Sequence, residues 1–198
     1  MATRYEQPQR AGQIILVLLL LWAAAISAAA IAGWLTAMPT IGVPAITATG
    51  ITLPMLAYAN SPSLRRWFAD VGLKRLTLFH AWRIGAAGLF FVFGANGALP
   101  PTLVLDGGIG DLLAGIFALI AAALPFARWR YWGAHLFGAA DLIVAMGTGI
   151  YFSFTDPASM ANVRLLPFAL IPMFGVAVTF TVHMIAFDLL RRQPGSAQ

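Results

Sequence analysis

The sequence predicts an all-α protein that crosses a membrane as a single bundle of six transmembrane helices. Charged residues make up only 10% of the 198-residue chain, against about 25% in soluble domains, so the chain lacks the polar surface of a soluble fold. Apolar runs of about 17 residues or more recur along it, and each can cross a hydrocarbon core of about 30 Å. These runs do not alternate between apolar and polar residues, which argues against a transmembrane β-barrel.

The first predicted span covers approximately residues 13–35 and is apolar on every face. Arg10, the apolar run after it and the alanine-rich segment that follows are typical of a secretory signal with its cleavage site. The apolar stretch continues to Leu35, however, which is longer than the apolar core of such signals. We therefore expect a retained helix, and a cleaved signal peptide is the alternative.

The second predicted span, approximately residues 43–59, is the shortest and carries several threonines. Thr52 precedes Pro54, and a proline at this position leaves the carbonyl of Gly50 without its helical donor. A neighbouring threonine or a water has to satisfy that carbonyl, since lipid cannot. We therefore expect a kinked helix whose polar side faces protein.

Four further spans are separated by short links. The link from Ser63 to Arg75 carries four cations and is expected to contain a short surface helix. A basic and aromatic hairpin, Arg128–Trp132, joins the fourth span to the fifth, and the last span contains Pro167 and Pro172. With no soluble segment of any size, residues 1–198 are predicted to form one membrane domain. The four spans cover approximately residues 76–94, 107–126, 133–154 and 163–190.

The cations are distributed unevenly over the links. With six spans, ten of the 12 Lys and Arg residues fall on one side, Arg164 falls on the other, and Arg83 lies inside a span. An excess of Lys and Arg marks the cytoplasmic side, so both termini are predicted to be cytoplasmic. The preference for Arg over Lys is typical of a GC-rich bacterial genome, so we expect the inner membrane of a bacterium. The ten residues are Arg4, Arg10, Arg65, Arg66, Lys74, Arg75, Arg128, Arg130, Arg191 and Arg192.

Three spans followed by three also allow an inverted repeat, because the first and fourth spans would run in opposite directions. The starts of the spans match only loosely between the two halves, and the halves share no residue pattern. The predicted 3+3 repeat therefore rests on the order of the spans alone.

With this topology, the position of a residue within its span gives its depth in the membrane. At 1.5 Å per residue, His80, His135 and His183 lie about 4 to 11 Å from the cytoplasmic ends of three different spans. Arg83 and Asp141 lie about 10 and 12 Å deep in the same half. An isolated charge inside the membrane costs about 2.5–3.5 kcal/mol on insertion scales. We therefore expect Arg83 and Asp141 to form an ion pair or to share a polar cavity.

Transport of a small solute or an ion is the leading prediction for this polar zone. Intramembrane ionisable residues and broken helices near the midplane are common at transporter sites, and Arg83 could receive an anionic group. Alternatively, the histidines have a structural role only. They then hydrogen-bond to backbone, Ser or Thr groups, or reach the lipid headgroups. The candidate pathway residues are His80, Arg83, Asp141, His183, Thr52 and Asp111.

A metal or haem site is the second prediction. His80, His135 and His183 could together hold a divalent metal ion, because they come from three helices at similar depth. Asp141 or Asp188 would add an oxygen ligand. Two of the histidines could instead bind the iron of a haem b axially, as in a membrane redox protein. None of them forms the closely spaced pair that is typical of a zinc-binding helix.

A third prediction is an accessory subunit of a membrane complex. Its intramembrane charges would then pair with those of a partner membrane subunit or of a second copy in a homo-oligomer. The sequence does not decide between these three classes of function.

The segment from Asp106 to Asp111 precedes the fourth predicted span. Asp106 is expected to cap that helix, and Asp111 to lie near the positive end of its dipole. Gly108-Ile109-Gly110-Asp111 is also similar to the Gly-x-Gly-Asp motif of intramembrane aspartyl proteases such as presenilins and prepilin peptidases. The resemblance implies that Asp111 shares a proton with a second, facing aspartate. The third span has no aspartate, and Asp111 is expected only about 7 Å from the outer face, far from Asp141.

Other features of the sequence argue against several classes of chemistry and of partner. The chain has no cysteine, which excludes disulfides, thiolate chemistry and Cys-ligated metals. The net charge of +5 comes from cations next to apolar spans, so the expected partner is the lipid bilayer and not nucleic acid. A Walker A loop, a Gly-x-Ser-x-Gly elbow and a His-Glu-x-x-His helix are all absent, so we do not expect an enzyme of these common classes.

Overall fold

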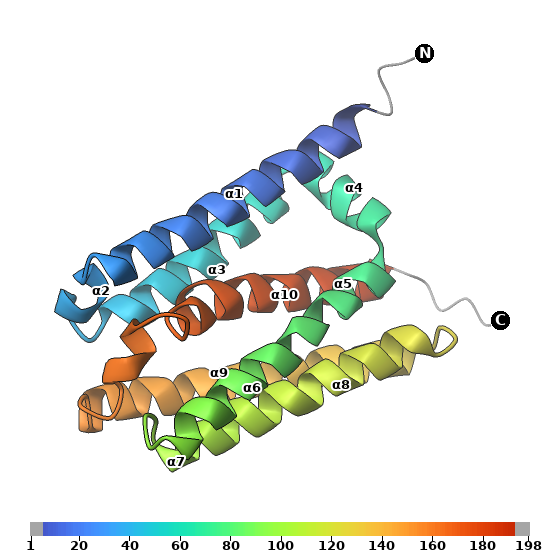
Figure 1. The fold of residues 1–198 in the computed structure, drawn as a ribbon. Helices are drawn as coiled ribbons and strands as arrows, with labels where there is room; N and C mark the ends of the chain where they lie inside the picture. Colours follow the sequence, from blue (N-terminus) through green and yellow to red (C-terminus); the bar gives the residue numbers. More distant parts are fainter. Residues whose placement is uncertain (1–5, 193–198) are drawn as a thin grey trace.

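The computed structural model describes the backbone of residues 6–192 and the side chains of residues 11–192 (Figure 1). Arg4 and the side chain of Arg10 lie outside this range. Within the described residues every regular element is a helix. Six segments are long and apolar enough to cross a membrane, which is the predicted number. They are Ala11–Ile31, Gly42–Asn60, Leu73–Ala95, Pro101–Ala123, Arg128–Thr155 and Ile171–Arg192.

The first predicted span is divided into two helices. α1 covers Glu6–Ile31 and α2 covers Trp34–Ala37. Gly33 between them has a φ angle of +75°, which residues with a side chain rarely adopt. The chain turns at this glycine, so the long helix ends before Leu35.

α3 covers Gly42–Asn60 and agrees closely with the second predicted span. Pro54 lies inside α3 without ending it. The short helix α4, Pro62–Val71, follows in the basic link, as the sequence predicts. Ser61 caps α4, because its hydroxyl oxygen accepts a hydrogen bond of 3.2 Å from the backbone N–H of Leu64.

The third span is continuous but changes its helical geometry halfway. α5 covers Leu73–Phe79, a 3₁₀ turn covers His80–Trp82, and α6 covers Arg83–Ala95. A 3₁₀ turn winds three residues per turn instead of 3.6, and inside a longer helix it often marks a functional position. Here it carries two of the candidate side chains, His80 at its start and Arg83 directly after it.

The fourth span begins at Pro101 and ends at Ala123, earlier at both ends than the predicted 107–126. α7 (Pro101–Leu103), a π-helical segment (Val104–Ile109) and α8 (Gly110–Ala123) make up this span. Pro101 occupies a first-turn position, where a missing N–H is tolerated, so it starts the helix instead of belonging to a loop. At the other end, Pro125 forces the residue before it into an extended conformation.

α9, Arg128–Thr155, forms the fifth span.

The prediction that Asp106 caps the fourth span is wrong, because that span begins five residues before it. The Asp106 carboxylate instead accepts a hydrogen bond of 2.6 Å from the Thr148 hydroxyl of α9. It therefore links two helices.

The sixth span begins at Ile171, later than the predicted residue 163. The chain between α9 and Ile171 forms turns and a short 3₁₀ helix, Ala161–Arg164. Pro167 lacks the backbone N–H that a helix interior requires, and regular helix forms only beyond it. A π-helical segment, Ile171–Val176, then leads into α10, Ala177–Arg192.

α10 runs through the middle of the bundle (Figure 1). It contacts α3 on one side and α5 and α9 on the other. In the most apolar 18 residues of the last span 67% of the residues are buried, against 6% in the first span. Thr179, Thr181 and His183 of α10 are therefore buried among other helices, whereas most residues of α1 are exposed or half-buried. Nothing in this arrangement tests the inverted repeat, which stays a prediction.

Candidate functional site

The three histidines of the chain meet at one place in the interior. His80 comes from the 3₁₀ turn, His135 from α9 and His183 from α10. Their side chains are only 1 to 2% exposed. One ring nitrogen from each lies within 4.8 Å of the corresponding nitrogens of the other two. The structure therefore brings together the three residues that sequence reasoning grouped by depth.

The hydrogen bonds around His135 favour one tautomer of its ring. The Thr77 hydroxyl donates its single proton to the carbonyl oxygen of Leu73 at 2.8 Å. The same oxygen lies 3.0 Å from Nε2 of His135, and with its proton on the carbonyl it accepts the proton that Nε2 carries in one of the two tautomers of the ring. Nδ1 of His135 is then left with a lone pair, as a metal-binding imidazole requires. This lone pair accepts a hydrogen bond of 2.9 Å from the Nδ1–H of His183, which leaves Nε2 of His183 with a lone pair as well.

Three ring nitrogens in this cluster have no hydrogen-bond partner within the described residues. They are both nitrogens of His80 and Nε2 of His183. An unsatisfied polar atom in a dry interior costs about 1–3 kcal/mol, so native structures rarely leave several in one place. A ligand that accepts imidazole lone pairs would satisfy one nitrogen of His80 and Nε2 of His183 and would remove that part of the penalty.

The rings are packed against one another. The His80 and His183 rings are stacked, with their centroids 3.9 Å apart and an angle of 16° between their planes. The His135 ring meets both rings edge-on. This packing does not fit the haem b prediction, because a porphyrin has to lie between its two axial imidazoles. An imidazole lone pair lies in the plane of its ring, so stacked rings have to rotate slightly before they bind one ion together.

A second polar cluster surrounds Arg83, whose side chain is fully buried. Its Nε donates to Asp111 at 2.6 Å, and its terminal nitrogens donate to the Asp141 carboxylate and, at 3.0 Å, to the carbonyl oxygen of Gly138. Of the two arrangements predicted for Arg83 and Asp141, an ion pair or a shared cavity, the structure shows the ion pair. Arg83 also pairs with Asp111, which the sequence did not predict.

The predicted distance between Asp111 and Asp141 is wrong. Because the fourth span starts at Pro101, Asp111 lies ten residues inside it, or about 15 Å deep at 1.5 Å per residue. Both carboxylates consequently reach the same guanidinium. They bracket a cation instead of facing each other to share a proton, which is the arrangement that the protease resemblance implies. Two carboxylates and a carbonyl thus engage three of the five N–H donors of this guanidinium.

Gly138 lies between the two clusters. A Cβ atom at this position would come within 2.6 Å of Cε1 of His183 and within 3.0 Å of a terminal nitrogen of Arg83. The absence of a side chain therefore lets the histidines and the Arg83 ion pairs approach across one backbone position of α9.

Two of the participating residues, Thr77 and Gly138, were missed by sequence reasoning, and one predicted residue, Thr52, lies outside both clusters. Thr77 lies three residues before His80, a helical spacing that could have revealed it, whereas Gly138 has no side chain to attract attention. Thr52 was proposed as a pathway residue, but it is exposed on the outside of α3. The threonine of α3 that faces protein is Thr47, whose hydroxyl lies 2.8 Å from the carbonyl oxygen of Pro172.

Comparison with protein families covers most of this bundle. A family model described as a domain of unknown function, DUF8737, matches residues 40–191. The chain belongs to this family. The DUF8737 region contains both polar clusters and begins after α1 and α2. No curated protein and no solved structure matches the chain.

Proposed function

We propose that this protein is an integral membrane protein that binds a divalent transition-metal ion through His80, His135 and His183. The observation that carries the proposal is the convergence of three buried imidazoles, in which both nitrogens of His80 and Nε2 of His183 have no hydrogen-bond partner within the described residues. Thr77 orients the His135 ring, in the way that outer hydrogen bonds orient metal-binding histidines.

The ligand set favours particular metals. Imidazole nitrogens suit Zn²⁺, Cu²⁺, Ni²⁺ and iron, whereas Mg²⁺ and Ca²⁺ require oxygen ligands. Asp111 and Asp141 already pair with Arg83, so the site offers three neutral nitrogens. Three histidines leave a fourth position of a tetrahedral zinc centre open for water or another small ligand.

Metal content tests this proposal. The full chain, expressed with transition metals supplied and purified in detergent without a histidine tag, is expected to retain one ion per chain by elemental analysis. Added Zn²⁺ or Co²⁺ is expected to bind with the same stoichiometry, and Mg²⁺ is not expected to compete. Purified protein that stays metal-free and binds neither ion would contradict the proposal.

Transport of the bound ion is the second candidate. The observation in its favour is that two of the six spans contain π-helical segments, Val104–Ile109 and Ile171–Val176, a geometry that is frequent at functional sites. Uptake of the ion into proteoliposomes that enclose a metal-sensitive dye measures this activity. Protein that binds the ion but does not move it would assign the site to a resident metal.

We also propose the orientation of the bundle, with both termini on the cytoplasmic side of a bacterial inner membrane. The one-sided distribution of cations supports it. Because the chain has no cysteine, single cysteines map the topology without background. In intact cells, a membrane-impermeant thiol reagent is expected to label Ala158→Cys, in the loop after α9, and not Ser63→Cys on α4. The opposite labelling pattern would reverse the orientation.

A further inference from the structure

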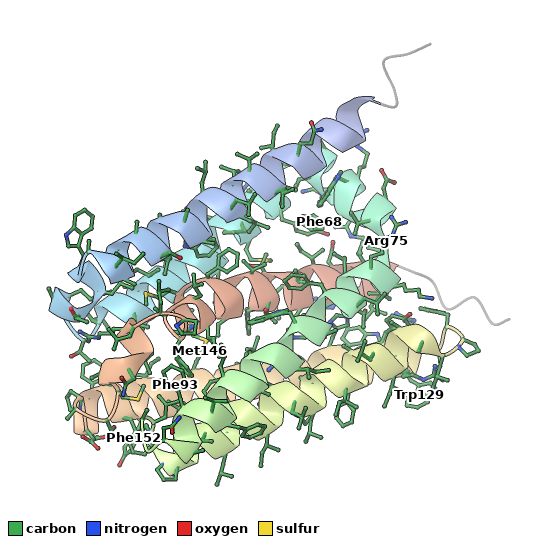
Figure 2. The ribbon with its side chains drawn as sticks, viewed as in Figure 1. Phe68, Arg75, Phe93, Trp129, Met146 and Phe152 are labelled. Carbon is green, nitrogen blue, oxygen red and sulfur yellow. The ribbon has the colours of Figure 1, made fainter. Side chains whose placement is uncertain are left out.

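A cavity of about 470 Å³ lies between α3, α4 and α10, apart from the two polar clusters. Three arginines line it, together with Tyr58, Ala69 and Leu189. The arginines are Arg65 and Arg66 of α4 and Arg192 at the end of α10. Figure 2 shows Phe68 of the same short helix and Arg75 just beyond it, at this end of the bundle.

The positive charge around the cavity exceeds the negative charge. Arg192 pairs with Asp188 at 2.9 Å, and Asp188 also accepts a hydrogen bond of 2.6 Å from the Tyr58 hydroxyl. Arg65 donates to backbone carbonyls at the end of α3 and has no carboxylate partner within the described residues. Of the three guanidinium groups, only that of Arg192 pairs with a carboxylate within the described residues.

Arg66 is the cation with the most freedom to bind a ligand. Its side chain is exposed, and within the described part of the chain it makes no hydrogen bond or ion pair. Guanidinium groups donate two parallel hydrogen bonds to phosphate, which makes arginine the usual residue for binding that group.

The other walls of the cavity are formed by Pro62, Ala69, Leu189 and the ring of Tyr58, and they are mainly apolar. Leu64 and Phe68 on the opposite face of α4 pack against a hydrophobic cluster that contains Tyr58 and Leu189. α4 therefore lies across the end of three spans with its apolar face inward and its arginines outward, at the level where lipid headgroups meet water. A ligand that fits both kinds of wall has an anionic head and an apolar body.

We propose that this cavity binds the phosphate group of an anionic phospholipid. Basic pockets between transmembrane helices are typical binding sites for such headgroups. The cations hold the phosphodiester, and the apolar walls contact the first part of the acyl chains. Free phosphate would use the cations but not the walls, so it is expected to bind more weakly.

Native mass spectrometry of the full chain in detergent tests this proposal. Short-chain phosphatidylglycerol is expected to bind one molecule per chain, and phosphatidylcholine of the same chain length is expected to bind at least fivefold more weakly. Arg66→Gln is expected to weaken phosphatidylglycerol binding about fivefold, since one cation near a lipid surface contributes about 1 kcal/mol. The matched control, Arg75→Gln, removes the same charge from an exposed residue outside the cavity and is expected to leave binding unchanged.

A second variant separates shape from charge. Ala69→Phe fills the cavity while keeping all three arginines, and it is expected to weaken the lipid and spare inorganic phosphate. Equal losses in Arg66→Gln and Arg75→Gln would reduce the effect to general surface charge and overturn the proposal. Inorganic phosphate that binds as tightly as the lipid would overturn it too. Metal content is expected to be unchanged in all of these variants. A failure of the lipid proposal can therefore be told apart from a failure of the metal-site proposal.

Discussion

Replacing His183 by alanine is expected to lower the affinity for the bound metal ion by more than 100-fold. His183 supplies one of only three imidazoles in the site, and the neighbouring carboxylates are already paired with Arg83. No other side chain in the described cluster can take its place. Isothermal titration of the detergent-purified variant with Zn²⁺, and the visible absorption of bound Co²⁺, measure the loss.

Two further variants make this result specific. Thr181→Val removes a buried hydroxyl from the same helix, which donates to the carbonyl oxygen of Ala177 and to no other group within the described residues, and is expected to bind metal normally. Thr77→Val removes the hydrogen bond that orients His135 and is expected to lower the affinity about 10- to 100-fold. Metal binding that is equal in His183→Ala and Thr181→Val would exclude the histidine cluster as the site.

Replacing Arg83 by methionine is expected to destabilise the fold by about 3–5 kcal/mol, the usual penalty for removing one partner of a buried ion pair. The variant leaves the carboxylates of Asp111 and Asp141 in a dry interior without their counter-charge. Denaturant unfolding in detergent, followed by circular dichroism, measures the change in the free energy of unfolding.

The cause of that loss can be separated from a loss of packing volume. The triple variant Arg83→Met, Asp111→Asn, Asp141→Asn removes all three charges and is expected to recover most of the stability. Arg192→Gln breaks the exposed pair with Asp188 and is expected to change stability far less. A triple variant that is no more stable than Arg83→Met alone would refute the charge argument.

The number of long helices followed from hydropathy, because an apolar run long enough to cross a bilayer has few alternative folds. The ends of the helices were harder to predict because proline acts in opposite ways at the two ends. Pro101 starts a helix where the sequence suggested a loop, and Pro167 delays one where the sequence suggested helix. Propensity alone does not say which end of a helix a proline occupies.

The errors in the predicted helix ends also affected the predicted positions of the site residues. The grouping of His80, His135 and His183 needed only approximate depths, so it tolerated errors of a few residues. The position of Asp111 did not, since a six-residue error at the start of its span moved it away from Arg83 by more than one helical turn. Thr52 and Thr47 could not be told apart from the sequence, because which face of α3 meets α10 depends on packing between helices.

The sparse protein contacts of α1 have a consequence for its behaviour in lipid. A helix held mainly by its neighbours keeps its angle, whereas one held mainly by lipid adjusts its tilt to the thickness of the bilayer. Only 6% of the most apolar part of α1 is buried, and the chain turns at Gly33 directly after it. In thicker or thinner bilayers α1 would therefore change its tilt. α10, enclosed by helices, would keep its tilt and hold His183 beside His80 and His135.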